Sequence, residues 1–397
     1  MIHPVGARVD GADEFGPAVE RVLPRLPRLL AFGEPMHGED EFLRYRNALI
    51  AHLVTHAGFR AVAIESSCLH AALVDDYVRH GRGDLDHVME HGFTHTSGTS
   101  PANRDLVRLL AAHNRTADEP VRFFGFDAPV EMMGADSPRA ALSALHGFLD
   151  ARLDHLPATW DRIDGLLGDD ERWSDPAAAM DPSRSVGGSA GARELRLITD
   201  DLRWVLAGDV PALAADPDEL WDAELAARTA AGLLAYHAGM AGDSPARVAR
   251  LLSIRDTMMA DNLLALAARG TPTLVFAQNQ HLHRGVTRWR LGELDLRWHS
   301  AGALVAHRLG EDYAVIGSAL GTAAHHGIPE PDPDTIEGVL AALPGRARLV
   351  PAAQLPRDAK PRTTTHHSYF PLDPTRRDDY DAVLLLGTID ATGPGSE

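Results

Sequence analysis

The chain contains very little cysteine or lysine. Cys68 is the only cysteine among 397 residues, so no disulfide can form within the chain. Lys360 is the only lysine, and 38 basic side chains stand against 56 acidic ones, which gives a formal net charge of -18. Nucleic acids and anionic membrane surfaces require a basic footprint, so this acidic balance argues against both as partners.

Long apolar runs are also missing. No run approaches the length that is needed to span a membrane. Residues 1–19 include Pro4, Asp10, Asp13 and Glu14, where a signal peptide would have its apolar core. We therefore expect a cytoplasmic protein that does not associate with membranes.

Several motifs of covalent and phosphate chemistry are absent as well. The sequence has no Gly-x-Ser-x-Gly elbow, and it has no glycine-rich phosphate loop. The sequence gives no evident base for Cys68. A serine or cysteine nucleophile is therefore disfavoured, which leaves carboxylates and imidazoles as the candidate catalytic groups.

The residues that are present predict an α/β fold. Hydrophobic residues make up 45% of the chain, which is enough for a substantial core. Short β-like runs bounded by glycine or polar turns alternate with longer helical patterns, which is typical of a mostly parallel central sheet with flanking helices. The expected strands are 29–32, 60–65, 121–126, 273–277 and 313–316, with a late strand at 380–386 that is a candidate sheet edge.

The middle of the chain differs from both ends. Residues 137–269 are almost entirely helical in pattern, with apolar residues at three- and four-residue spacing. We expect a helical insertion or cap on an α/β catalytic domain formed by residues 1–136 and 270–390, followed by a disordered tail at 391–397. Within the insertion, residues 175–191 are rich in Ser, Gly, Ala and Pro. This predicts a mobile loop, which either controls access to a site or is a surface excursion.

The clearest candidate for chemistry is the segment from Gly33 to Gly38, between the first expected strand and a helical pattern. Loops at the carboxyl ends of parallel strands form the crevice where such folds bind ligands. This loop carries Glu34 and His37, three residues apart. The carboxylate can orient the imidazole, which can then act as a general base on water near neutral pH. On its own, the pair is also compatible with an ordinary surface contact.

Three further expected strands end in polar residues. Glu65 follows a buried apolar run, where an ionised carboxylate is costly unless it is paired, and Arg46 on the preceding helix is its expected partner. The other two strand ends carry Asp127, then Gln278, Asn279 and His281. Because four parallel strands would deliver these groups to the same end of one sheet, we expect a single site there.

His281 and His283 raise the alternative of a metal site shared with Glu34 and His37. Residues two apart on an extended segment point to the same face, so both imidazoles could reach one ion. Both are as easily explained as pocket or surface residues, and we assign no metal and no other cofactor. A further pair in a loop, His366-His367, has no role that the sequence indicates.

These residues form a pattern that resembles the erythromycin esterase family. The resemblance runs from Gly33 to about Ile389, and its motifs follow one another in the family's order. Each motif is modest alone, and their order and spacing together are specific. The matching segments are Gly33-Glu34-x-x-His37-Gly38, Arg46, Glu65, Gly125-x-Asp127, Arg255-Asp256-x-x-Met259-Ala260-x-Asn262, Tyr313-x-x-Ile316-Gly317 and Tyr380-Asp381-Ala382-Val383.

The chain departs from the family pattern in two places. Where the family has His-Asn-x-His after its fourth strand, this chain has Gln278-Asn279-Gln280-His281. Glutamine exchanges hydrogen bonds but cannot take a proton, so a step that used the first histidine is in doubt. An aromatic-rich stretch of the family is also altered, to Phe93-Thr94-His95-Thr96.

The resemblance implies metal-independent hydrolysis of a macrocyclic lactone, with a small-molecule natural product as substrate. It implies that His37 is the general base and that Glu34 orients it or positions the water. Arg46 and Glu65 would form a supporting ion pair, and His281 would donate a second proton or polarise the carbonyl. The expected substrate-binding residues are Asp127, Gln278, Asn279, Arg255, Met259 and His283.

Two other functions stay open. The same base could drive a cyclisation, an elimination or an acyl transfer in a biosynthetic pathway, which the loss of one family histidine favours. Alternatively, the chain could be a non-catalytic protein that binds a metabolite. The sequence indicates neither the substrate nor the oligomeric state.

Overall fold

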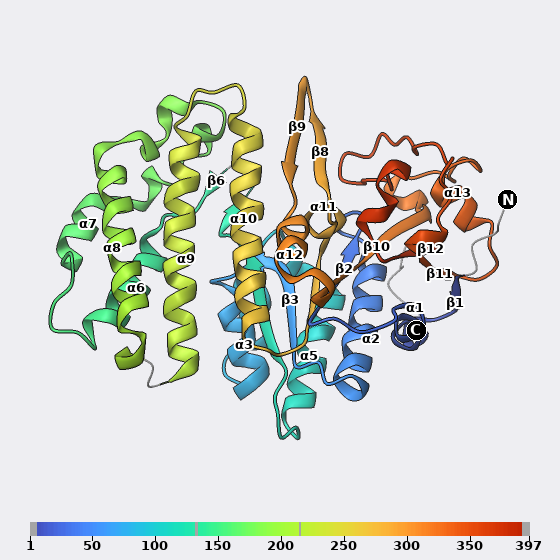
Figure 1. Cartoon of the computed structure of the whole chain (residues 1–397), viewed down its shortest axis with the longest axis horizontal. Coiled ribbons are helices and arrows are strands. Elements are labelled where there is room, and N and C mark those ends of the chain that lie inside the picture. The colour runs from blue at the N-terminus through green and yellow to red at the C-terminus, as the bar shows by residue number, and fades with distance from the viewer. Residues whose placement is uncertain (1–5, 132–133, 214–215, 391–397) are drawn as a thin grey trace.

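The centre of the molecule is an eight-stranded sheet, seen in the computed structural model that describes residues 6–131, 134–213 and 216–390 (Figure 1). The strands lie in the order β1-β11-β12-β10-β2-β7-β3-β4. Those from β12 to β4 run parallel, and β11 and β1 continue the sheet beyond β12 in antiparallel pairing. The strands span Ala7–Val9 (β1), Leu29–Glu34 (β2), Ala61–Ser67 (β3), Arg122–Asp127 (β4), Thr273–Gln278 (β7), Tyr313–Thr322 (β10), Ala347–Pro351 (β11) and Ala382–Thr388 (β12).

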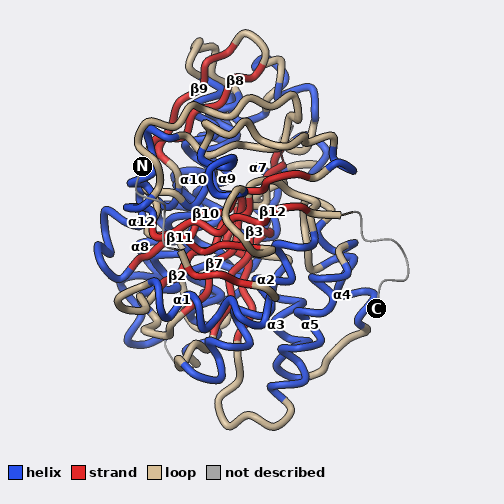
Figure 2. Tube along the Cα trace, turned by 90° about the vertical axis from the view of Figure 1, so that its right-hand side faces the viewer, coloured by secondary structure: helices blue, strands red, loops and turns tan. Residues whose placement is uncertain are grey.

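Helices cover both faces of this sheet, and Figure 2 shows the strands at the centre of the molecule. On one face, Phe42 of α2 and Leu106 of α5 share a core with Phe32 of β2. On the other face, Leu263 of α10 shares a core with Val275 of β7. Every residue of β2 is buried, as expected for a parallel strand that is covered on both sides. The helices of these two layers are Phe15–Val22 (α1), Asp40–His56 (α2), Ala71–His80 (α3), Leu85–His91 (α4), Pro101–Asn114 (α5), Arg247–Ala268 (α10), Asn279–Leu282 (α11), Ala301–Leu309 (α12) and Ile336–Ala341 (α13).

The predicted helical middle of the chain is present, and most of it forms a bundle beside the sheet (left in Figure 1). Its helices are Arg139–Asp150 (α6), Trp160–Leu167 (α7), Ala190–Leu213 (α8) and Pro217–Met240 (α9), and they share a core of their own. Helix α10 instead packs on the sheet, although it falls inside the range 137–269. The division of the chain at these boundaries stays a prediction, and the expected tail at 391–397 lies outside the described residues. No helix in the described ranges is long and apolar enough to cross a membrane.

The α/β fold with a mostly parallel sheet is confirmed, but several strand predictions were wrong. The late strand is not an edge, because β12 lies between β10 and β11. The strand expected at 313–316 continues as β10 to Thr322. Two hairpins were not predicted: Val130–Glu131 (β5) with Gly134–Ala135 (β6), and Val286–Leu291 (β8) with Leu294–His299 (β9). Strands β1 and β11 were also missed, since three to five residues carry little periodic signal.

The segment 175–191, expected to be a mobile loop, is a succession of short 3-10 turns. Gly187 within it lies against the backbone of His237 in α9, so closely that a Cβ would be 2.0 Å from the His237 carbonyl oxygen. Its mobility stays a prediction. None of its residues lines the cavity described below, which favours a surface excursion over a gate to that cavity.

Asn279 ties three strands together across Gly33. Its amide donates to the Ser318 carbonyl of β10 (2.7 Å) and accepts from the Ser318 N–H (3.1 Å), although Asn279 itself follows β7. Because β2 lies between β7 and β10, the Asn279 side chain crosses β2 at Gly33. A Cβ on Gly33 would lie 2.3 Å from Asn279 Oδ1. Glycine is required here for close approach.

Replacing Gly33 with alanine is therefore expected to lower the free energy of unfolding by about 1–3 kcal/mol, the usual cost of overpacking. Denaturation in urea measures the change. Gly147→Ala on α6 is a matched control, because a Cβ there meets nothing within 4 Å and alanine favours the helix. A Gly33→Ala protein as stable as the wild type would contradict the close approach.

Candidate active site

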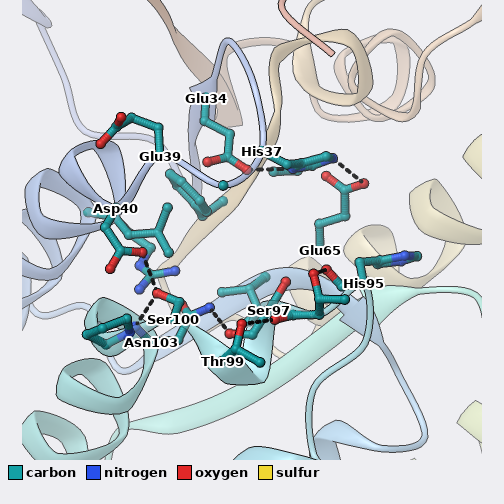
Figure 3. A pocket seen from close by; sticks show the side chains of 18 of the residues that line it. Glu34, His37, Glu39, Asp40, Glu65, His95, Ser97, Thr99, Ser100 and Asn103 are labelled. Atoms are coloured by element: carbon teal, nitrogen blue, oxygen red, sulfur yellow. Dashed lines mark hydrogen bonds and ion pairs between the residues drawn. The ribbon is translucent and has the colours of Figure 1, made fainter. Parts of the chain in front are cut away.

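The loop after β2 opens into a cavity at the carboxyl ends of the parallel strands. Glu34 is the last residue of β2, His37 comes from this loop, Glu65 comes from β3, and Arg46 comes from α2. Figure 3 shows His37 between the carboxylates of Glu34 and Glu65. The cavity has a volume of about 660 Å³. The structure therefore brings four predicted site residues together around one space.

His37 is held at one ring nitrogen and exposed to the cavity. Its Nδ1 lies 2.7 Å from Glu34 Oε1, and its side chain is 52% exposed. Glu34 is buried, and its other oxygen, Oε2, has no hydrogen-bond partner among the described protein groups. The loop can turn this tightly because Gly38 adopts a left-handed φ of 82°. The pair thus presents an imidazole at the cavity wall, with a buried carboxylate behind it.

The neighbouring carboxylates change the charge state of His37. Burial alone would lower the pKa of His37, but Glu65 and Glu34 outweigh it and raise the pKa to about 9. Burial also raises the pKa of Glu34, against the opposing effect of His37. At neutral pH, the resting His37 is therefore mostly a protonated imidazolium. The sequence had suggested an imidazole that acts as a base near neutral pH, so the pKa of His37 is higher than expected.

Glu65 is surrounded by cations, but Arg46 is not among those within salt-bridge distance. Its Oε1 lies 3.2 Å from Arg255 Nη2, 3.4 Å from His281 Nε2 and 3.8 Å from His37 Nε2. Its Oε2 accepts from the Gln278 N–H (2.9 Å). Burial would raise the pKa of Glu65, yet its cationic neighbours lower it to about 2. Glu65 is thus a permanent anion held behind His37.

The predicted pairing of Arg46 with Glu65 was therefore wrong. Arg46 donates from Nε (3.1 Å) and Nη2 (2.8 Å) to Asn47 Oδ1, and its guanidinium lies 4.9 Å from the centre of the Phe276 ring. Burial lowers the pKa of Arg46 to about 10, so it stays charged at neutral pH. Arg46 places a buried positive charge in the cavity wall without neutralising Glu65.

Arg255 takes the role that the sequence gave to Arg46. Its guanidinium bridges Asp127 and Glu65: Nε lies 3.0 Å from Asp127 Oδ1, and Nη2 lies 2.5 Å from Asp127 Oδ2. His95 Nε2 also lies 2.9 Å from Asp127 Oδ2. Burial would raise the pKa of Asp127, but Arg255 and His95 hold it well below its usual range. Asp127 is fully buried and does not line the cavity, so the prediction that it contacts the substrate was wrong. It forms a structural ion pair with Arg255 instead.

His95 lines the cavity and was not predicted as a site residue. Its two ring nitrogens face Asp127 and Glu131, the latter at 2.8 Å. Burial would lower the pKa of His95, but these carboxylates raise it to about 10. His95 and Thr96 both have positive φ angles, 55° and 59°. The sequence gave no signal for this backbone, since neither residue type favours it as glycine does.

His281 lies behind Glu65, outside the cavity lining. Its Nδ1 is 2.8 Å from Asp256 Oδ1, and Asp256 also accepts from the Ala301 N–H (2.9 Å) and from the Trp298 indole. Burial would lower the pKa of His281, but Asp256 and Glu65 raise it. A carboxylate–imidazole–carboxylate chain therefore holds Glu65 in place, and Asp256, which the sequence placed in a motif without a role, is a member of it.

Gln278 and Asn279, both predicted to bind substrate, are occupied by the backbone. Gln278 Oε1 accepts from the Gln280 N–H (2.5 Å) at the start of α11, and its Nε2 donates to the Pro35 carbonyl (3.4 Å). The Asn279 amide is used by Ser318, as described above. Gln278 thus caps a helix where the family pattern has a histidine.

Met259 and His283 were also predicted to bind substrate, and both face elsewhere. Met259 is fully buried in the core between α10 and the sheet. His283 accepts at Nδ1 from the Gly285 N–H (2.9 Å) and contacts Arg376. Burial and Arg376 hold the pKa of His283 well below its usual range. The shared metal site with His281 was wrong, because the segment turns into α11 and the two imidazoles bind different partners.

A further set of polar residues lines the cavity around Glu39, and the sequence did not predict it. Asp40 accepts from the Ser100 hydroxyl (2.6 Å), and Glu39 lies close to two imidazoles. These imidazoles belong to His325 and His326, which follow β10. Because β10 was predicted to end six residues too early, the sequence did not place these two histidines at the carboxyl edge of the sheet. The members of this set are Glu39, Asp40, Ser97, Thr99, Ser100, Asn103, His325 and His326.

The comparisons with known proteins agree with this architecture. A family model for erythromycin esterase matches residues 54–388 of the chain. A crystal structure of a Bacillus cereus protein aligns with a TM-score of 0.73 at 14% identity, over 98% of this chain and 95% of that chain. The erythromycin esterase EreC, as a histidine-to-asparagine mutant in its open conformation, aligns with a TM-score of 0.71 at 17% identity, over 99% and 100%. A succinoglycan biosynthesis protein also aligns, with a TM-score of 0.71 at 14% identity, over 98% and 95%. At these identities the structural matches establish a shared fold.

Proposed function

Because the chain belongs to the erythromycin esterase family, we propose that it hydrolyses an ester or macrolactone of a natural product with water activated by His37. The family and the fold support a hydrolase-like function. The observation that carries the finer proposal is the placement of His37, oriented by Glu34 at 2.7 Å and 52% exposed to the cavity. An imidazole that a carboxylate orients and that a ligand can reach meets the geometric needs of a general base.

In the proposed reaction, neutral His37 takes a proton from water at Nε2 while its Nδ1–H donates to Glu34. The 3.8 Å separation between Nε2 and Glu65 is longer than a hydrogen bond, so Nε2 is available to the water. The water oxygen bonds to the ester carbonyl carbon, and the carbonyl oxygen gains the negative charge. Collapse breaks the bond to the alcohol oxygen, and His37 returns the proton to that oxygen.

The cations of the cavity wall suit this chemistry. Arg46 and His95 both line the cavity, and both remain positively charged at neutral pH. Fixed positive charges near a developing oxyanion stabilise the transition state without reorganisation. In this scheme His281 positions Glu65 and does not touch the substrate.

The pH dependence of kcat/KM tests the role of His37. Only the neutral imidazole accepts a proton, and the pKa of His37 is raised to about 9. We therefore expect kcat/KM to rise about tenfold per pH unit below that pKa, to stop rising above it, and to begin to fall near pH 10, where Arg46 and His95, each with a pKa of about 10, lose their charge. Steady-state kinetics from about pH 6 to about pH 10 measure the profile. A flat profile below the pKa would contradict base catalysis by His37.

Product analysis tests the reaction itself. Incubation with a panel of ester and macrolactone natural products in heavy-oxygen water should give a product heavier by one labelled water, with the label in the new carboxylate. His37→Asn should remove this product. The first alternative, a cyclisation, elimination or acyl transfer by the same base, is favoured by Gln278 in place of a family histidine. It predicts a product without the label. Tight binding with no product under any condition would indicate a metabolite-binding protein.

A further inference from the structure

A group of side chains that could ligate a metal lies in the cavity wall, apart from His37 and Glu65. Glu39 precedes α2, and His325 and His326 lie in the turn Ala324–His326 that follows β10. All three line the cavity. Figure 3 shows the side chains of Glu39 and His37 leaving the same loop in different directions. None of the three has a part in the reaction proposed above.

The three side chains converge through single atoms. Glu39 Oε2 lies 2.9 Å from His325 Nε2 and 3.2 Å from His326 Nε2. The three potential ligand atoms all lie within 4.8 Å of one another. In a tetrahedral zinc site with bonds of about 2.0–2.2 Å, ligand atoms lie roughly 3.3 Å apart. The group therefore needs little movement to surround one ion.

The surroundings hold these ligands in position. Glu39 is buried, and its second oxygen accepts from the Glu41 N–H (3.0 Å), which anchors the carboxylate to the start of α2. The histidine turn is closed by paired hydrogen bonds between Ala323 and Ile328 (3.0 Å each). Gly327 within that turn has a left-handed φ of 67°. The hydrogen bond from the Glu41 N–H is an outer bond of the kind that orients metal ligands and supports their affinity, and the backbone bonds fix the histidine turn.

We propose that Glu39, His325 and His326 form a binding site for a divalent transition-metal ion, with Zn²⁺ as the best match. Two imidazoles and one carboxylate are a ligand set that binds zinc and leaves a coordination position open. The same set also suits Fe²⁺. All three side chains line the cavity, from which an oxygen atom of water or of a bound ligand could complete the coordination. The site does not depend on the proposed function, because metal binding is measured without a substrate.

Other histidine pairs on the surface could bind zinc weakly and must be separated from this site. The rings of His87 and His91 lie 4.4 Å apart, and those of His52 and His56 lie 4.6 Å apart. The double variant His87→Gln/His91→Gln is thus a matched control for His325→Gln/His326→Gln. Each removes two neighbouring imidazoles and keeps the polarity of the side chains.

Titration of the whole metal-free protein with Zn²⁺ in a calorimeter tests the proposal, and Co²⁺ provides a visible spectrum that reports nitrogen and oxygen ligands. We expect one tight site, retained in His87→Gln/His91→Gln. Zn²⁺ binding should be weaker by more than about 100-fold in His325→Gln/His326→Gln. This exceeds the loss of affinity expected when only a hydrogen-bond partner of a metal ligand is removed. Glu39→Gln should also weaken binding, and it keeps an oxygen for the Glu41 N–H, so its fold is preserved. Equal binding by the wild type and the two variants of the site would overturn the proposal, as would a tight site that only the control variant removes.

Discussion

The His37→Asn variant is expected to lose about 10²–10⁴-fold in kcat/KM for ester hydrolysis, the usual contribution of a general base. Asparagine can exchange hydrogen bonds but cannot take up a proton. The side chain of His37 is 52% exposed, so the variant should stay folded, but it should lose some stability because the buried Glu34 loses its imidazolium partner. Kinetics on a substrate found by the labelling experiment, together with thermal melting, measure the two effects separately.

The control lies on the helix that follows the same loop. His56 is exposed at the last position of α2, far along the helix from the cavity, and His56→Asn should leave kcat/KM unchanged. Glu34→Gln should lower kcat/KM less than His37→Asn, because Glu34 orients the base and does not take the proton. Full activity of His37→Asn would show that another group activates the water, and the neighbouring carboxylates are Glu34 and Glu65.

The Arg255→Met variant is expected to lose about 3–5 kcal/mol in the free energy of unfolding, the cost of leaving a buried charge unpaired. Methionine fills much of the same space but has no charge. Asp127 is fully buried, and Glu65 is nearly so, and both lose a hydrogen-bonded guanidinium. Urea denaturation at neutral pH measures the loss.

The loss should shrink as the pH falls. In the wild type the pKa of Asp127 is held below its usual range, and that of Glu65 is lowered to about 2. The ionised carboxylates therefore stabilise the folded protein fully above their unfolded pKa, near 4, and this stabilisation is lost as the pH falls toward 2. Without Arg255, both pKa values should rise from their lowered positions, although His281, His37 and His95 remain, so acid relieves the unpaired charge in the variant. Arg250→Met on the exposed side of α10 is the matched control and should change stability by less than about 0.5 kcal/mol. A difference that does not depend on pH would contradict the pairing.

Local pattern was enough to predict much of the fold. The apolar runs that became β2, β3, β4 and β7 are buried on both faces, so they are continuous in sequence and easy to recognise. The helices between residues 137 and 269 were also predicted, because their apolar residues recur every three or four positions. The hairpin β8–β9 and the short strands β1 and β11 were missed because they are short or half-exposed.

The sequence predicted those residues of the candidate site that lie at the end of a strand or directly after it. Glu34, His37 and Glu65 follow that rule, because a strand's direction alone brings its end to the carboxyl edge. The partners were predicted less well. Arg255 contacts Glu65 from a helix, and the two residues are 190 positions apart in the chain. A local sequence pattern therefore cannot predict whether Glu65 pairs with Arg46 or with Arg255.

The sequence by itself determined the elements and the kinds of residue at the strand ends, because burial and periodicity act within a few residues. The tertiary structure decided which of these groups meet. It turned Gln278 and Asn279 toward the backbone, placed Asp127 in an ion pair and added His95 to the cavity. It also brought Glu39 to His325 and His326. These outcomes depend on distances between elements far apart in the chain, and packing and electrostatic pairing set those distances only once the sheet is assembled.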